Sequence, residues 1–399
     1  MSEKPKAADP DRGNPVPRRA RQSSFPDLPA VCLSGISWDD LTQRPQHIMS
    51  RYSKFAPVLM VEPPRNPRYG IILNYVRPRT REVFPNIRSV SVVKPFPRDS
   101  SLRLLQSIND AFVRQMIDSL VTRLGFEDHL LWCYRYDSLS YGRTSKAKLV
   151  VYDCVDDWPA YLKSIPGVEA EENRLITASH VVFTTSQRLL ETKRRLNPHT
   201  YLVPNGVDFE HFDVLSTRPG VPPELERVPH PIIGFSGAVY GWVDLNLVEA
   251  IAKRRPDWSF VFVGPVHDGI DKPDFPNVHF IGYIPYEILP NYVASFDVCI
   301  LPFRHDQVTE SANPIKMYEY MATGKPIVST SIPEVEKFSS LIRIAEGADG
   351  FEKAIAAAID NDSNNLVSAR QSSARANSWN QRIETIMGIV RTRREELGV

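Results

Sequence analysis

Short apolar runs alternate with amphipathic helical patterns along most of the chain. The run 30–36 is typical of a buried strand that ends in a loop at 37–40. A helical pattern at 42–54 separates it from the next apolar run, 57–62. The alternation continues through strands expected at 130–133, 149–153, 181–184 and 201–203, with helices near 101–124, 169 and 187 between them. Such alternation predicts an α/β domain on a largely parallel sheet.

The pattern is interrupted once and then starts again. Residues 215–231 carry five prolines and no apolar periodicity, which is typical of a linker. The run 232–237 then repeats the strand-then-glycine opening of the first half. We therefore expect two Rossmann-like domains facing a cleft, with ligands at the carboxyl ends of the strands. The expected division is a disordered tail 1–29, domains 30–214 and 232–375 joined by the linker 215–231, and a helix 376–399 crossing back to the first domain.

One stretch, 310–329, combines a helix start with charged side chains. Asn313 and Pro314 suit the helix entry, and Gly324 suits its end. Lys316 and Glu319 then lie one turn apart beside the helix N-terminus, where free backbone N–H groups favour a phosphate. A lysine there can contact a diphosphate, and a carboxylate one turn later can accept hydrogen bonds from ribose hydroxyls. The alternative is a solvated Lys–Glu pair.

Composition narrows the class of protein. The 399 residues exceed what one core usually organises, and the net charge of +1 argues against nucleic acid as a partner. Four widely spaced cysteines, each in an apolar run, are expected to be buried in a reducing compartment. The N-terminus lacks the apolar core of a signal peptide, and no run of about 18 uncharged apolar residues occurs. We expect a cytoplasmic protein.

A basic segment qualifies that expectation. Five arginines and no acidic residue lie between positions 65 and 81, with Arg65 and Arg81 at its ends and an apolar centre at 71–73. Such a segment can contact an anionic bilayer at the inner face of the membrane while the protein acts on a lipid-linked acceptor. An edge strand or loop with solvated arginines is the alternative.

Several segments together resemble one family. They resemble the group 1 glycosyltransferases of the GT-B fold, in the order in which that family has them. The matching segments are 201–212 (YLVPNGVDFEHF), 260–265 (FVFVGP), 277–285 (NVHFIGYIP), 295–302 (SFDVCILP) and 315–328. The first half is similar to transferases of teichuronic acid and exopolysaccharide synthesis, through Trp38, 44–47 (RPQH), 61–63 (VEP) and 152–158 (YDCVDDW). The chain departs from the family at Ser311, where a glutamate is usual, and in the loop 237–244, where paired basic residues are missing.

The resemblance implies a donor site. It makes Lys316 a catalytic diphosphate contact and Glu319 the ribose contact, with Asn313, Pro314 and Ile315 lining the helix entry mainly through their backbone. Tyr283 and Ile284 follow a strand where related enzymes read the base through the main chain; a buried strand end is the alternative. The family uses basic side chains and a helix dipole on the diphosphate, so no metal and no cofactor is expected. The Ser311 departure leaves the stereochemical outcome open.

Acceptor-side candidates follow an expected strand of the first domain. Asp156 and Asp157 are adjacent carboxylates at its carboxyl end, and their repulsion can raise one pKa. Asp156 is the expected catalytic base and Asp157 a second acceptor-side residue; a helix cap or solvated turn is the alternative. His47 can touch the acceptor or a phosphate, with a structural role as its alternative.

These features predict a metal-independent glycosyltransferase of the hexosyltransferase type. It would move a sugar from a nucleotide diphosphate donor, with uridine as the expected nucleoside, to a polysaccharide or lipid-linked acceptor in cell-surface polysaccharide synthesis. A nucleotide-sugar epimerase on the same fold and a non-catalytic polysaccharide-assembly protein are the alternatives.

Overall fold

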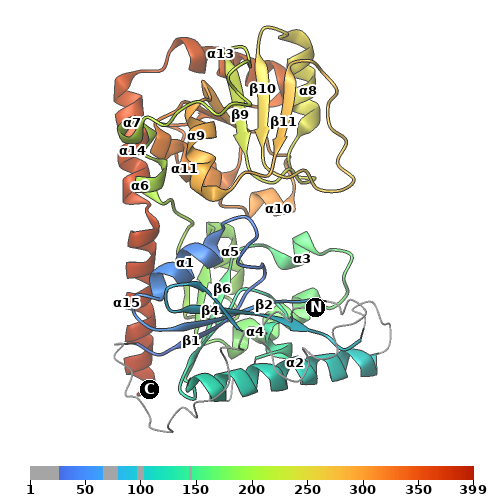
Figure 1. Cartoon of the computed structure of the whole chain (residues 1–399), viewed down its shortest axis with the longest axis vertical. Helices are drawn as coiled ribbons and strands as arrows, with labels where there is room; N and C mark the ends of the chain where they lie inside the picture. The colour runs from blue at the N-terminus through green and yellow to red at the C-terminus, as the bar shows by residue number, and fades with distance from the viewer. Residues whose placement is uncertain (1–26, 66–79, 97–102, 143–145) are drawn as a thin grey trace, which may run out of the picture.

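The computed structural model describes residues 27–65, 80–96, 103–142 and 146–399. The expected tail 1–29 therefore lies outside the described residues up to position 26, and so do positions 66–79 of the arginine-rich segment. Within the described residues, two parallel-stranded sheets form two stacked lobes (Figure 1). This confirms the expected α/β fold of two Rossmann-like domains.

The N-terminal domain is built on an eight-stranded sheet of the described chain, ordered β3-β4-β2-β1-β5-β6-β7-β8. Neighbouring strands are parallel except β3 and β4, which are antiparallel. The strands are β1 (Ala30–Leu33), β2 (Val58–Arg65), β3 (Arg81–Phe84), β4 (Ile87–Val93), β5 (Leu130–Cys133), β6 (Leu149–Cys154), β7 (Val181–Thr184) and β8 (Thr200–Leu202). Its helices are α1 (Arg44–Tyr52), α2 (Arg103–Leu124), η2 (Ser138–Ser140), α3 (Trp158–Tyr161), α4 (Val168–Ala178), α5 (Gln187–Lys193), α6 (Phe209–Phe212) and α7 (Val214–Thr217).

The C-terminal domain has six parallel strands in the described chain, ordered β11-β10-β9-β12-β13-β14. They are β9 (Ile232–Ser236), β10 (Ser259–Val263), β11 (Val278–Gly282), β12 (Val298–Leu301), β13 (Ile327–Ser329) and β14 (Arg343–Ile344). The helices are α8 (Leu245–Arg254), η4 (Tyr286–Ile288), α9 (Leu289–Ala294), α10 (Gln307–Glu310), α11 (Ile315–Thr323), α12 (Pro333–Glu336), α13 (Gly347–Asp360), α14 (Asn364–Ala376) and α15 (Trp379–Leu397).

Continuous apolar runs become the central strands because both faces of each sheet are covered. Every residue of β1, β5, β6 and β7 is buried, as is every residue of β9, β10 and β12. The four cysteines are buried and free, as expected. No helix of the described chain is long and apolar enough to cross a membrane.

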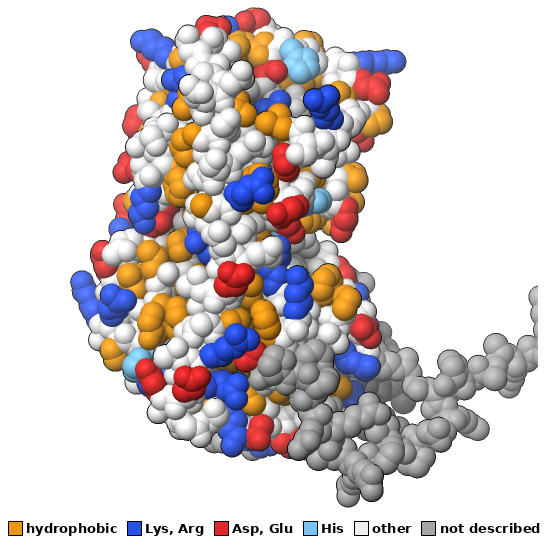
Figure 2. All heavy atoms as spheres, turned by 90° about the vertical axis from the view of Figure 1, so that its left-hand side faces the viewer, with side chains coloured by type: hydrophobic (Ala, Val, Ile, Leu, Met, Phe, Trp, Pro, Cys, Tyr) orange, Lys and Arg blue, Asp and Glu red, His pale blue; other side chains and the backbone are white. Residues whose placement is uncertain are grey.

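The last helix crosses back to the N-terminal domain, as expected. In Figure 1 helix α14 lies beside the C-terminal lobe and α15 continues down the side of the N-terminal lobe, where its apolar face joins the N-terminal core. Trp379 and Ile386 are fully buried in a cluster that contains Trp132 of β5 and Phe183 of β7. Figure 2 views the face that carries α14 and α15, where acidic and basic side chains are interspersed and no patch of one charge dominates.

Candidate functional site

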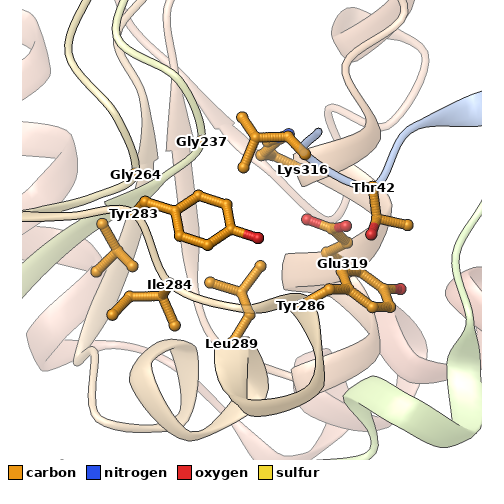
Figure 3. Close-up of a pocket in the computed structure, with 11 residues that line it drawn as sticks. Thr42, Gly237, Gly264, Tyr283, Ile284, Tyr286, Leu289, Lys316 and Glu319 are labelled. Atoms are coloured by element: carbon orange, nitrogen blue, oxygen red, sulfur yellow. The ribbon is translucent and has the colours of Figure 1, made fainter. Parts of the chain in front are cut away.

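A pocket between the two domains is lined by the loop before α1, the segments that follow β9 and β11, and residues of β10, η4, α9 and α11. It is lined by Leu41, Thr42, Gly237, Val263, Gly264, Tyr283, Ile284, Tyr286, Leu289, Lys316 and Glu319. In Figure 3 the Lys316, Glu319 and Thr42 side chains gather on one side of the pocket, and Tyr283, Ile284 and Leu289 line the other. The structure thus brings together four of the donor-site residues expected from the sequence: Tyr283, Ile284, Lys316 and Glu319.

Glu319 is the most unusual polar group in the pocket. Its side chain is 2 % exposed, and its Oε2 atom is buried without a hydrogen-bond partner. Burial raises the pKa of this carboxyl, while the neighbouring Lys316 and His211 offset part of the rise. A buried carboxylate oxygen without a protein partner costs free energy unless a water or a ligand supplies the hydrogen bond. Glu319 lines the pocket, from which either can reach it.

Two glycines let the backbone approach Lys316 closely. Gly237 has φ 138°, and a Cβ there would lie 2.6 Å from Lys316 Cε. Gly264 has φ 141°, and its Cβ would lie 2.2 Å from the Gly237 carbonyl oxygen. Larger residues would push this loop away from the lysine. The sequence suggested only that a glycine ends the strand β9, and it carried no sign that Gly264 would pack against that turn.

Lys316 lies in the first turn of α11, beside the helix N-terminus. No ion pair between described residues includes it, so its charge is available to a ligand. The pocket encloses only about 40 Å³, whereas ligand sites usually measure about 300–1,000 Å³. A nucleotide therefore requires the pocket to widen, and Tyr283, which is 54 % exposed, is a wall that can move.

The other residues of the helix entry lie outside this pocket. Asn313 is buried and joins the domains: its Oδ1 accepts from the Asn205 backbone N–H at 2.9 Å, and its carbonyl accepts from Asn205 Nδ2 at 2.7 Å. Its own Nδ2 donates to Tyr318. The Asn313 side chain is thus occupied by an interdomain contact. Pro314 and Ile315 do not line the pocket either, and Ile315 packs against the N-terminal core.

The structure separates the two adjacent carboxylates. Asp157 caps α3 by accepting from the Ala160 N–H at 3.3 Å, and its other oxygen accepts from the Ser311 hydroxyl across the cleft at 3.4 Å. The residue Asp156 has solvent-accessible surface, and no hydrogen bond between described residues includes its carboxylate. Crowding by surrounding protein atoms partly desolvates this carboxyl, and together with the charge of Asp157 it raises the pKa of Asp156 to about 6. Of the two, Asp156 is free to act on a ligand.

His47 is packed into the contact between the domains. Its ring is stacked on Trp379 with centroids 4.9 Å apart and meets Tyr286 edge-on at 5.4 Å. Burial lowers the pKa of His47 well below its ordinary value, and Arg51, His211 and Lys316 lower it further, so the ring is neutral. This packing gives His47 a structural part, and contact with an acceptor stays a prediction.

A second, larger cavity adjoins the donor pocket. It measures about 640 Å³ and shares Thr42, Tyr283 and Tyr286 with the pocket. Trp38 and Phe84 also line it. On the N-terminal domain's side of this cavity, Arg81 forms ion pairs with Asp39, which lines the cavity, and, at 3.7 Å, with Glu62. The described end of the arginine-rich segment is therefore already paired within the protein.

Tyr286 was not expected from the sequence. Its ring is stacked on His211 at 4.5 Å, and its hydroxyl oxygen is buried without a hydrogen-bond partner. No local pattern marks this tyrosine, because its importance comes from α1 and α6 packing around it. No group of three or more His, Cys, Asp or Glu side chains that could bind a metal occurs in the described part of the chain.

Comparison with solved structures identifies the class of fold. Sucrose-phosphate synthase from Thermosynechococcus elongatus superposes with a TM-score of 0.69 over 92 % of this chain and 99 % of its own, at 14 % identity. Anabaena HepE, solved with UDP and glucose, gives 0.61 over 92 % and 100 % at 13 % identity. An E. coli trehalose-6-phosphate structure bound with UDP-2-fluoro glucose gives 0.67 over 90 % and 98 % at 11 % identity. The fold is GT-B.

Sequence comparison narrows this class. Residues 230–361, in the C-terminal domain, match the family model "Glycosyl transferases group 1". The chain is also 28 % identical over 208 residues to a Bacillus subtilis (strain 168) protein named for teichuronic acid biosynthesis, the glycosyltransferase TuaH. That match covers 47 % of this chain and 52 % of TuaH, about half the length of the relative.

Proposed function

We propose that the chain transfers a sugar from a nucleotide diphosphate donor, with uridine as the nucleoside, to a saccharide or lipid-linked acceptor in cell-surface polysaccharide synthesis. The observation that carries the proposal is the buried Glu319 carboxylate, which lacks a partner for Oε2 and lies one helical turn from an unpaired lysine. Ribose hydroxyl groups can donate hydrogen bonds to the Glu319 carboxylate, and a diphosphate supplies negative charge beside Lys316. The HepE complex with UDP supports the same donor class, and the name of TuaH supports a role in polysaccharide synthesis.

The site residues divide the chemistry between the domains. The acceptor hydroxyl oxygen attacks the anomeric carbon as the bond from that carbon to the diphosphate oxygen breaks. The bonding pair leaves with the diphosphate, where Lys316 and the α11 N-terminus stabilise the growing charge. The hydroxyl proton passes to the Asp156 carboxylate. We propose that this chain's own groups supply the positive charge that stabilises the diphosphate, and we assign no metal or cofactor.

Thermal unfolding of Glu319→Gln tests the donor site. Because the folded chain raises the pKa of Glu319, the ionised carboxylate destabilises the fold at pH values above the unfolded pKa of about 4.3. Glutamine should therefore raise the Tm of the ligand-free chain at pH 7, and the gain should vanish near pH 4. UDP at about 100 times its Kd should stabilise the wild type by about 2.7 kcal/mol, and Glu319→Gln much less.

The exposed Glu249 of α8 offers a matched control, because Glu249→Gln should change neither the unligated Tm nor the shift with UDP. Equal shifts with UDP in the wild type and Glu319→Gln would remove Glu319 from the donor site. No shift of the wild type with UDP, ADP, GDP or CDP would reject the proposed function.

A further inference from the structure

A run of aromatic rings crosses the cleft next to Asp156. Tyr161, at the end of α3 in the N-terminal domain, lies with its ring centroid 5.8 Å from that of Trp242 in the C-terminal domain. Trp242 is stacked on Tyr240 at 4.5 Å with an interplanar angle of 23°. On the other side, Trp158 meets Tyr161 edge-on at 6.1 Å. Figure 1 places α3 of the N-terminal domain below α10 of the C-terminal domain, on the side of the molecule away from α15.

The loop that carries two of these rings is held firmly in place. It connects β9 to α8, and its backbone bridges Val239 to Val266 on one side and Val243 to Phe303 on the other. The Arg304 N–H also donates to the Trp242 carbonyl at 2.8 Å. These contacts fix the loop backbone at the cleft edge. Large apolar rings held by a rigid backbone, yet only partly buried, are typical of a binding surface.

The same loop connects the aromatic run to the donor pocket. It begins at Gly237, which packs against Lys316, and reaches Trp242 five residues later. This is the loop in which the resemblance leads one to expect paired basic residues, and here it carries aromatic residues instead. The loop thus extends from the Lys316 side of the pocket to the aromatic run.

Asp156 lies at the other edge of the aromatic run. It comes two residues before α3, and its charge and Tyr240 contribute, after burial, to raising the pKa of Tyr161. A carboxylate without a hydrogen-bond partner among the described residues thus lies close to Tyr161, at one end of the aromatic run. A pyranose matches this combination, because its C–H face packs on aromatic rings while its hydroxyl groups donate to a carboxylate.

We propose that Tyr161, Trp242 and Tyr240 form a platform for a pyranose ring of the acceptor, with its reactive hydroxyl at Asp156. The inference rests on the proposed function and specifies its acceptor as a saccharide recognised through a ring face. Because Tyr161 and Trp242 belong to different domains, the platform is complete only when the cleft is closed, so acceptor binding and closure favour each other.

The test uses the full chain saturated with UDP and two matched probe sets. One set is the methyl glycosides of glucose, galactose, N-acetylglucosamine, N-acetylgalactosamine and glucuronic acid, and the other is the octyl glycosides of the same sugars. Affinities are measured by saturation-transfer NMR. At least one sugar should bind the wild type, with Trp242→Ala weakening it at least tenfold and Tyr161→Ala about fivefold, whereas Trp242→Phe keeps most of the affinity. Equal affinity of both sets indicates a free saccharide as the source, and tighter octyl binding that is still lost in Trp242→Ala indicates a lipid-linked one.

Phe84→Ala is the matched control. Phe84 is an aromatic residue that is 40 % exposed, as Tyr161 is, but it lines the 640 Å³ cavity. UDP affinity should stay within twofold in every variant, which verifies folding. Absence of glycoside binding to wild type that binds UDP would overturn the platform alone. Loss of binding in Phe84→Ala but not in Trp242→Ala or Tyr161→Ala would place the sugar in the 640 Å³ cavity and overturn it as well. Failure of wild type to bind UDP would instead reject the proposed function.

Discussion

Lys316→Ala should lower the rate of sugar transfer by about 10²-fold or more while leaving the fold intact. Lys316 lies in the first turn of α11, against the Gly237 turn, and no ion pair between described residues uses its charge. Charge grows on the diphosphate as the glycosidic bond breaks, so the lysine contributes more in the transition state than in the bound ground state. The measurement is kcat and KM for the donor, with circular dichroism to verify folding.

Lys325→Ala is the matched control for this substitution. Lys325 follows the same helix but lies at its far end, beside a different surface groove. Its replacement should change donor turnover by less than about twofold, because its charge is remote from the diphosphate. Near wild-type turnover in Lys316→Ala would contradict the assignment of this lysine to the leaving group.

Asp156→Asn should lower the rate of sugar transfer by about 10³-fold or more, with donor affinity unchanged. An amide occupies nearly the same space as the carboxylate but cannot accept the hydroxyl proton. The wild type should also lose kcat/KM as the pH falls below about 6, because the proton acceptor is the ionised form and its pKa is raised to about 6. The measurements are transfer rates from pH 4.5 to 8 and titration calorimetry with UDP.

Asp157→Asn separates the two adjacent carboxylates. Asparagine can also cap α3 and bond to Ser311, so its rate should stay within about threefold of wild type. A large loss in Asp157→Asn together with retained transfer in Asp156→Asn would exchange the two roles.

The fold could be predicted because its physical causes are local. Apolar runs of four to six residues, such as 149–154, can be covered on both faces only within a parallel sheet. The end of α11 could also be predicted, because Gly324 suits the left-handed conformation that follows a helix, and it adopts φ 74° there. The short edge strands β3 and β14 were not expected, because an edge strand has no continuous apolar run to mark it. The strand β4, which lies between β3 and β2, was not expected either.

Only part of the candidate site could be predicted from the sequence. Lys316 and Glu319 share a helix, so their spacing placed them together. The contacts that distinguish Asp156 from Asp157, and that occupy the Asn313 side chain, join residues more than 100 positions apart. Tyr286 and the aromatic run across the cleft depend on the same long-range packing, which no local pattern in one sequence reports.

A crystal structure of the chain with UDP tests the donor site directly. We expect the diphosphate to lie against Lys316 and the α11 N-terminus, ribose hydroxyls to donate to Glu319 Oε2, and the uracil to lie beside Tyr283 and Ile284. Tyr283 should move to widen the pocket. UDP bound in the adjoining 640 Å³ cavity, with Glu319 Oε2 still unpartnered, would contradict this donor site.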